Sequence, residues 1–225
     1  MCNIPSSRCY GMVVLSSGPE SPIIIRGYAD GTVSSFVGED QKSVALRKGA
    51  ILKMVAVSAD DGTSYVIAAT TRGALILLTG KDLKTCVIEP QAHRCSITAL
   101  DACFDTDQRS ILMFTGGDDN LLKGHRFDIH EQSFHLDLFT DRQRHCSQVT
   151  DIGVDLKRRL VCSVGLDRRL NVWRYADDLQ NIFFLWQGHL LVQDPSVLIV
   201  HDMKEDNVLC ICIAGVGIQK VIAKF

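Results

Sequence analysis

The chain has 225 residues, of which 46% are hydrophobic and 22% are charged, and its formal net charge is −2. This composition supports a folded core and excludes global disorder, and the near-neutral charge excludes a field that draws the whole protein to nucleic acid or membrane. No apolar run reaches the roughly 18 residues of a membrane span, and the N-terminus lacks the pattern of a signal peptide, so we expect a cytoplasmic protein.

Five segments with one shared pattern follow one another along the chain. Each is an apolar run, a tight polar turn and a second apolar run: IIIRGYADGTVSSFV, YVIAATTRGALILLT, ILMFTGGDDNLLKGHRF, LVCSVGLDRRLNVWRY and VLCICIAGVGIQKVIAKF. Their turns fall near Asp30, Arg72, Asp119, Asp167 and Gly215, at intervals of 42, 47, 48 and 48 residues. This spacing is close to the period of propeller blades, about 40–45 residues.

Another β-like run precedes each segment, and a fourth follows some of them, as in SFHLDLF and NIFFLWQ. Four short antiparallel strands per period make one blade, and no window concentrates strong helix formers. We therefore predict an all-β fold, a single propeller over residues 1–225 with about five blades. The expected blades span about 10–47, 50–89, 93–140, 145–188 and 195–225, and the last lacks its outer strand. Because closed propellers have about 4–8 blades, the chain is either a small closed ring or part of a larger one.

The stretch CSVGLDRRLNVW at 162–173 contains Ser163 and Asp167, and His145 precedes it. These residue types also build serine hydrolases, which carry the nucleophile on a strained G-x-S-x-G turn beside an oxyanion hole. No such motif occurs, and Ser163 lies inside an apolar strand. The sequence therefore favours a structural role for these residues and predicts no catalytic residue.

This fourth segment resembles the WD-repeat family. His145 precedes the innermost strand, Ser163 lies on the second strand, Asp167 in the turn and Trp173 on the third strand. The resemblance implies a relay of hydrogen bonds from the tryptophan through the serine and the histidine to the aspartate. Such a network stabilises a fold when every member is satisfied.

The third segment is a partial copy of the same pattern. His93, Thr115 and Asp119 stand at matching positions, but His125 replaces the tryptophan. The first segment keeps only its turn aspartate, Asp30, and the second and fifth keep none of the relay. We therefore expect the relay in the third and fourth blades only.

The last 135 residues or so resemble the C-terminal end of the WD-repeat proteins that regulate a tRNA wobble-position 2′-O-methyltransferase. The stretches that carry the resemblance are AHRCSITAL, FTGGDDNLLKGHRF, SQVTDIGVDLKRRLVCSVGLDRRLNVWRY and GVGIQKV. It implies a non-catalytic scaffold with an FtsJ-like methyltransferase as protein partner and tRNA reached through that partner. A second hypothesis is a WD-repeat adaptor for signalling, vesicle trafficking or ubiquitin ligation with no RNA role. A third, an enzyme of unknown type, has no motif in its favour.

No cofactor, metal or small-molecule substrate is expected. Cys210 and Cys212 alternate on one strand, but no second cysteine pair completes a four-ligand zinc site, so we expect buried, reduced thiols. GVGIQK lacks the Lys-Ser/Thr pair of a phosphate-binding loop and reads as a tight turn between strands.

Basic residues cluster around the fourth segment. Successive turns of an antiparallel sheet lie at opposite ends of its strands, so residues 157–159 face one side of the propeller. The arginines that are able to share the other side, which we call the arginine rim, are Arg142, Arg144, Arg168 and Arg169. The rim is a candidate contact for phosphates or for an acidic protein face, and the alternative is ordinary solvated turn charge.

Overall fold

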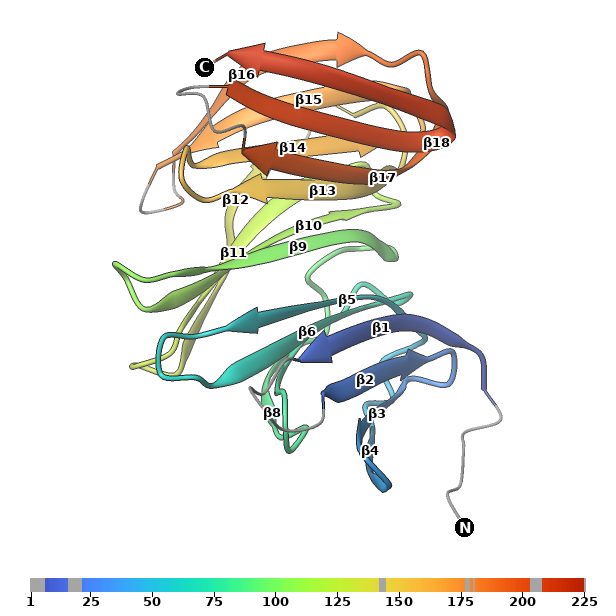
Figure 1. Cartoon of the computed structure of the whole chain (residues 1–225), viewed down its shortest axis with the longest axis vertical. Helices are drawn as coiled ribbons and strands as arrows, with labels where there is room; N and C mark the ends of the chain where they lie inside the picture. Colours follow the sequence, from blue (N-terminus) through green and yellow to red (C-terminus); the bar gives the residue numbers. More distant parts are fainter. Residues whose placement is uncertain are drawn as a thin grey trace.

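The computed structural model of the chain describes residues 7–15, 22–141, 145–176, 179, 181–202 and 208–224. Within these ranges the chain forms strands and no helix. The strands make five antiparallel sheets that follow the order of the sequence, stacked from the first sheet (blue) to the fifth (red) in Figure 1.

Four of the sheets have four strands each, paired in the order of the chain. The first contains β1 (Cys9–Leu15), β2 (Ile23–Tyr28), β3 (Thr32–Val37) and β4 (Asp40–Ala45). The second contains β5 (Ile51–Ser58), β6 (Ser64–Thr70), β7 (Leu75–Thr79) and β8 (Thr85–Glu89). The third contains β9 (Ile97–Asp105), β10 (Ser110–Gly117), β11 (Leu122–Asp128) and β12 (Ser133–Asp141). The fourth contains β13 (Val149–Asp155), β14 (Leu160–Gly165), β15 (Arg169–Tyr175) and β16 (Ile182–His189).

The turn between the second and third strands has a shared backbone conformation in these four sheets. The residue after the expected turn position has a positive φ: 80° at Gly31, 73° at Gly73, 63° at Asn120 and 56° at Arg168. Glycine and asparagine adopt this left-handed conformation at low cost. The turn chemistry therefore explains the reversal in the first three sheets, and Arg168 adopts the same conformation in the fourth.

The fifth sheet contains β17 (Gln193–Asp202) and the long β18 (Val208–Lys224). The register with β17 covers the first half of β18, from Leu209 to Val216. Gly217 then has a φ of 111°, and Figure 1 shows the β18 ribbon turning back at this end before it reaches the C-terminus. The reversal coincides with the turn that the sequence predicts at GVGIQK.

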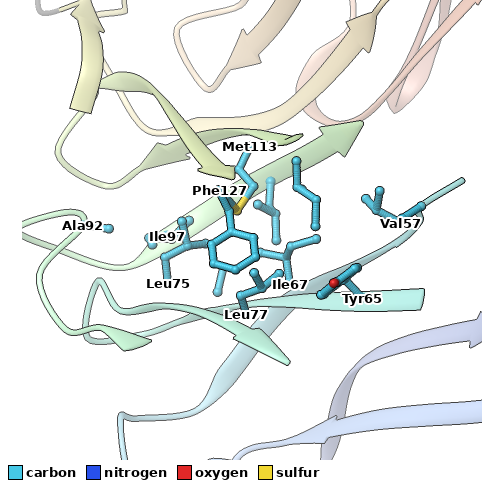
Figure 2. Close-up of a cluster of buried hydrophobic side chains, with 13 residues drawn as sticks. Val57, Tyr65, Ile67, Leu75, Leu77, Ala92, Ile97, Met113 and Phe127 are labelled. Carbon is cyan, nitrogen blue, oxygen red and sulfur yellow. The ribbon is translucent and has the colours of Figure 1, made fainter. Parts of the chain in front are cut away.

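Four clusters of buried apolar side chains hold the sheets together, one at each junction between neighbours. Figure 2 shows the junction of the second and third sheets, where Phe127 and Met113 face Ile67, Leu75 and Leu77. All five are at most 2% exposed. Side chains of this size each contribute about 1.5–3 kcal/mol on burial, so these junctions supply the main stabilisation.

The first strands of the sheets line the inside of the stack. Each contacts the next, in the order β1, β5, β9, β13 and β17. Among the described strands, no contact of similar extent joins β17 back to β1. The fold is an all-β propeller of five blades arranged as an open arc, with an incomplete fifth blade. The predicted fold class is confirmed, and within the described residues the first and fifth sheets lie at opposite ends of the arc (Figure 1).

Candidate interaction surface and its hydrogen-bonded supports

A buried histidine ties the fourth sheet to its own turn. Nδ1 of His145 lies 3.2 Å from both carboxylate oxygens of Asp167, and Nε2 lies 2.7 Å from Oγ of Ser163. Asp167 also accepts backbone N–H bonds from Cys146 (2.8 Å) and Arg169 (3.1 Å). With Nδ1–H donating to the carboxylate, Nε2 is free to accept the serine hydroxyl hydrogen. The loop before β13, strand β14 and the β14–β15 turn are thereby fastened together.

Trp173 and Asn171 complete the surroundings of this histidine. The Trp173 indole lies with its centroid 6.4 Å from that of the His145 ring, and Nδ2 of Asn171 lies 3.0 Å from Nε2 of His145. Both side chains lie on the same face of β15, since they are two residues apart on a strand. Asn171 was not among the residues predicted from the sequence, and its N-x-W spacing to Trp173 is the signal that identifies it.

The third sheet contains a similar hydrogen-bonded network, which differs at the position of the tryptophan. Nδ1 of His93 lies 2.9 Å from Asp119 Oδ1, and its Nε2 lies 2.8 Å from Oγ1 of Thr115. The Thr115 hydroxyl also lies 2.8 Å from Nε2 of His125, which occupies the position of the tryptophan. An imidazole therefore continues the network where the fourth sheet has an indole.

A glycine two residues before each turn aspartate makes room for the histidine. A Cβ at Gly165 would lie 2.8 Å from Nδ1 of His145, and a Cβ at Gly117 would lie 3.1 Å from Nδ1 of His93. A side chain at either position would collide with the imidazole and, more closely, with the backbone carbonyl of Gln148 or Ser96. The G-x-D spacing is thus part of the network and is a sequence signal for it beyond the predicted residues.

Both networks are buried, as expected for residues with a structural role. Ser163 and Thr115 are 0% exposed, so a substrate has no path to either hydroxyl in this structure. A nucleophile in a hydrolase stands open at a turn beside an oxyanion hole. The arrangement fixes turns, and it offers no site at which a substrate meets the reacting groups.

The electrostatics of the two aspartates agree with this role. Burial by itself would raise the pKa of Asp167, but hydrogen bonds from His145 and from the backbone of Cys146 lower that pKa below its ordinary value. The pKa of Asp119 is lowered in the same way, against burial, by His93 and the backbone of Arg94. Both carboxylates are therefore held ionised as acceptors.

The β14–β15 turn carries two members of the arginine rim. Arg168 is exposed and follows Asp167 directly, so the network fixes the backbone that presents it. Arg169 is half-buried, with its Nε 3.9 Å from Oδ2 of Asp167. Arg142 and Arg144 lie outside the described residues.

The opposite end of the fourth sheet also carries cations, but acidic residues pair with them. Arg158 binds Asp155 (2.8 Å) and Asp202 (2.6 Å), and Lys157 lies 3.2 Å from Asp202. Asp202 is on β17, so these ion pairs join the fourth sheet to the fifth. This side presents a locally balanced charge.

The cysteines depart in part from the expectation of buried thiols. Cys162 and Cys210 are buried, with Sγ of Cys210 3.8 Å from Sγ of Cys212, but Cys95 and Cys146 are exposed. Cys95 and Cys146 lie in the loops before the first strands of the third and fourth sheets, and Cys9 on β1 is exposed as well. Within the described part of the chain, no three His, Cys, Asp or Glu side chains come together as metal ligands, and no helix is suited to crossing a membrane.

Comparison with known proteins identifies the architecture. A chain in the solved structure titled "Crystal Structure of Mitotic Checkpoint Complex" superimposes with a TM-score of 0.65 over 97% of this chain and 68% of that chain, at 15% sequence identity. At this identity the similarity shows the fold, a WD-type β-propeller. No family model and no curated protein matches the sequence.

Proposed function

We propose that the chain is a non-catalytic scaffold that binds a protein partner through the turns at the edge of its propeller. The observation that supports this most directly is the burial of both Ser/Thr–His–Asp networks beneath the turns that they fix. A rigid scaffold with functional residues on its loops is a common arrangement for recognition surfaces.

The partner that we infer is an FtsJ-like tRNA 2′-O-methyltransferase, with tRNA reached through it in the cytoplasm. The inference depends on the sequence resemblance of the C-terminal part and on the basic character of the arginine rim. Arg168 is exposed on a fixed turn, as a contact for an acidic protein face or for phosphate requires. Methyl transfer itself takes place in the partner under this proposal.

The test is direct binding between the purified chain and a purified FtsJ-like methyltransferase, with and without tRNA. Alanine at all four rim positions is expected to weaken binding at least about tenfold, the equivalent of about 1.4 kcal/mol. If phosphates are involved, the affinity also falls steeply as salt is raised.

The matched control is the double variant Lys157→Ala, Arg159→Ala on the opposite side of the same sheet, which leaves the ion pairs of Arg158 in place. Equal losses in both variants, or none in either, would contradict the rim as the contact. Absence of methyltransferase binding in the unmodified chain would contradict this partner and favour the general adaptor. Binding of a methyl donor to the chain alone would contradict a purely non-catalytic role.

A further inference from the structure

An apolar cleft of about 540 Å³ lies between the outer part of the fourth sheet and the last segment of β18. Leu185 and Trp186 of β16 form one wall, and Val221 and Ile222 are on the other. Exposure is 43% for Trp186 and 59% for Ile222, although both are large apolar side chains. Arg174 and Lys224 also line the cleft and give it positive charge.

The equivalent place between the second and third sheets is filled. In the fourth sheet, Trp186 on β16 pairs with Val172 on β15. In the second sheet, Val87 on β8 pairs with Leu77 on β7, which is the residue equivalent to Val172. Val87 is therefore the counterpart of Trp186. Val87 packs against the junction cluster together with Phe134 and Leu136, which belong to the fourth strand of the next sheet. A fourth strand therefore packs at the same junction as Val87, whereas Trp186 is 43% exposed.

The strand that would cover Trp186 is a fourth strand, which the described part of the fifth sheet does not contain. The other four sheets each end in a fourth strand, and among the described residues the fifth consists only of β17 and β18. Figure 1 shows the returning part of β18 at the outer end of the molecule, and its residues 221–224 line the cleft together with Leu185 and Trp186 of β16. An edge strand has unpaired backbone N–H and C=O groups that are able to pair with an added chain.

We propose that this cleft binds an extended peptide segment of a partner protein, which adds to β18 as the fourth strand of the fifth sheet. Main-chain hydrogen bonds to β18 supply affinity, and alternate apolar side chains enter the cleft between Trp186 and Ile222. Arg174 and Lys224 select a segment with acidic residues. This site lies apart from the arginine rim. The proposed ligand, an extended apolar segment with acidic residues, does not depend on the identity of the methyltransferase as partner.

The chain itself contains a suitable probe, the sequence of β12 (Ser133–Asp141), SFHLDLFTD, whose Phe134 and Leu136 pack in the equivalent junction. We expect the labelled synthetic peptide to bind the intact chain saturably and to shift the fluorescence of Trp186, the more exposed of the two tryptophans. Ile222→Lys is expected to reduce the affinity at least about tenfold, with Ile88→Lys, a 38%-exposed residue on β8, as the control that leaves it unchanged. Replacing both peptide aspartates with lysine is expected to weaken binding as well.

A peptide with N-methyl groups along one edge tests the strand addition itself, since it keeps the side chains and loses main-chain donors. Loss of binding on N-methylation, together with the effect of Ile222→Lys, would support the proposal. Absence of binding, or equal binding of the N-methylated peptide, would overturn it. If the chain alone sediments as a multimer that Ile222→Lys dissociates, a second copy is the occupant and the proposed partner segment is wrong. Each of these outcomes is independent of binding at the arginine rim.

Discussion

At the scale of single residues, the molecule depends on buried imidazoles that connect a strand to a turn. His145 and His93 each lie within hydrogen-bond distance of a carboxylate on one side and a hydroxyl on the other. Because the surroundings are apolar, an unsatisfied member of such a network costs more than the bond contributes when it is made. The networks are consequently sensitive to single substitutions.

Asp167→Ala is expected to lower the free energy of unfolding by about 1–3 kcal/mol, since the buried Nδ1–H of His145 and the N–H of Cys146 both lose their acceptor. Denaturant titration measures the change, with the exposed Asp107→Ala as the control. An unchanged midpoint for Asp167→Ala would contradict the structural role of the network.

His125 is expected to make stability fall in mild acid. Complete burial, followed by the charges of His93 and Lys123, lowers the pKa of His125 well below its ordinary value of 6.5. The unfolded chain therefore binds a proton below about pH 6.5 that the folded chain excludes, and stability falls by up to about 1.4 kcal/mol per pH unit as the pH falls. His125→Phe should remove this contribution between pH 7 and pH 5, measured by unfolding at each pH. An identical slope in the variant and the unmodified chain would show that His125 does not titrate on unfolding.

At the scale of elements, short polar contacts join the first strands of neighbouring sheets. Thr98 on β9 donates its hydroxyl to the carbonyl of Val149 on β13 at 2.6 Å, and Asp101 accepts the N–H of Val154 at 2.9 Å. Asp151 on β13 repeats the second contact one sheet later, with the N–H of Leu198 at 2.7 Å. Apolar packing sets the spacing of the sheets, and these directional bonds set their register.

Thr98→Val tests this contribution, because valine keeps the shape and removes the donor. We expect a loss of about 0.5–1.5 kcal/mol in the free energy of unfolding, the net value of one hydrogen bond. Thr106→Val, at an exposed residue in the turn after β9, is the matched control. A loss at Thr98 no larger than that at Thr106 would mean that packing alone fixes the two sheets.

At the scale of the whole molecule, the first sheet has one face that no other sheet covers within the described part of the chain. Met12 on β1 is 60% exposed, whereas the residues at the same register position of the next three sheets, Met54, Leu100 and Ile152, are 9%, 4% and 3% exposed. The difference follows from position, since each later sheet packs against the one before it. A face of this kind on an isolated chain favours association.

Substitution of Met12 and of Met54 compares an exposed with a buried residue at the same register position and so tests the open arc. Met54→Ala is expected to cost about 2–5 kcal/mol because it leaves a cavity at the junction of the first two sheets. Met12→Ala removes a side chain that faces solvent and should change stability by less than about 0.5 kcal/mol. Thermal and denaturant unfolding compare them, and equal losses would indicate that the face of Met12 is covered.

The sequence by itself determined the repeat, the all-β class and the incomplete fifth blade, because strand pairing and turn chemistry depend on local residue type at a regular spacing. The resemblance to WD repeats singled out the histidines, hydroxyl residues and aspartates of the two networks, in both of which the hydroxyl residue stands four residues before the aspartate. Only the tertiary structure decided that the described parts of the first and fifth sheets lie at opposite ends of the arc, that Asn171 and the glycines at 117 and 165 belong to the networks, and that Trp186 borders an open cleft. These properties arise where segments from different repeats come together, and their distances and exposures depend on packing that no local spacing records.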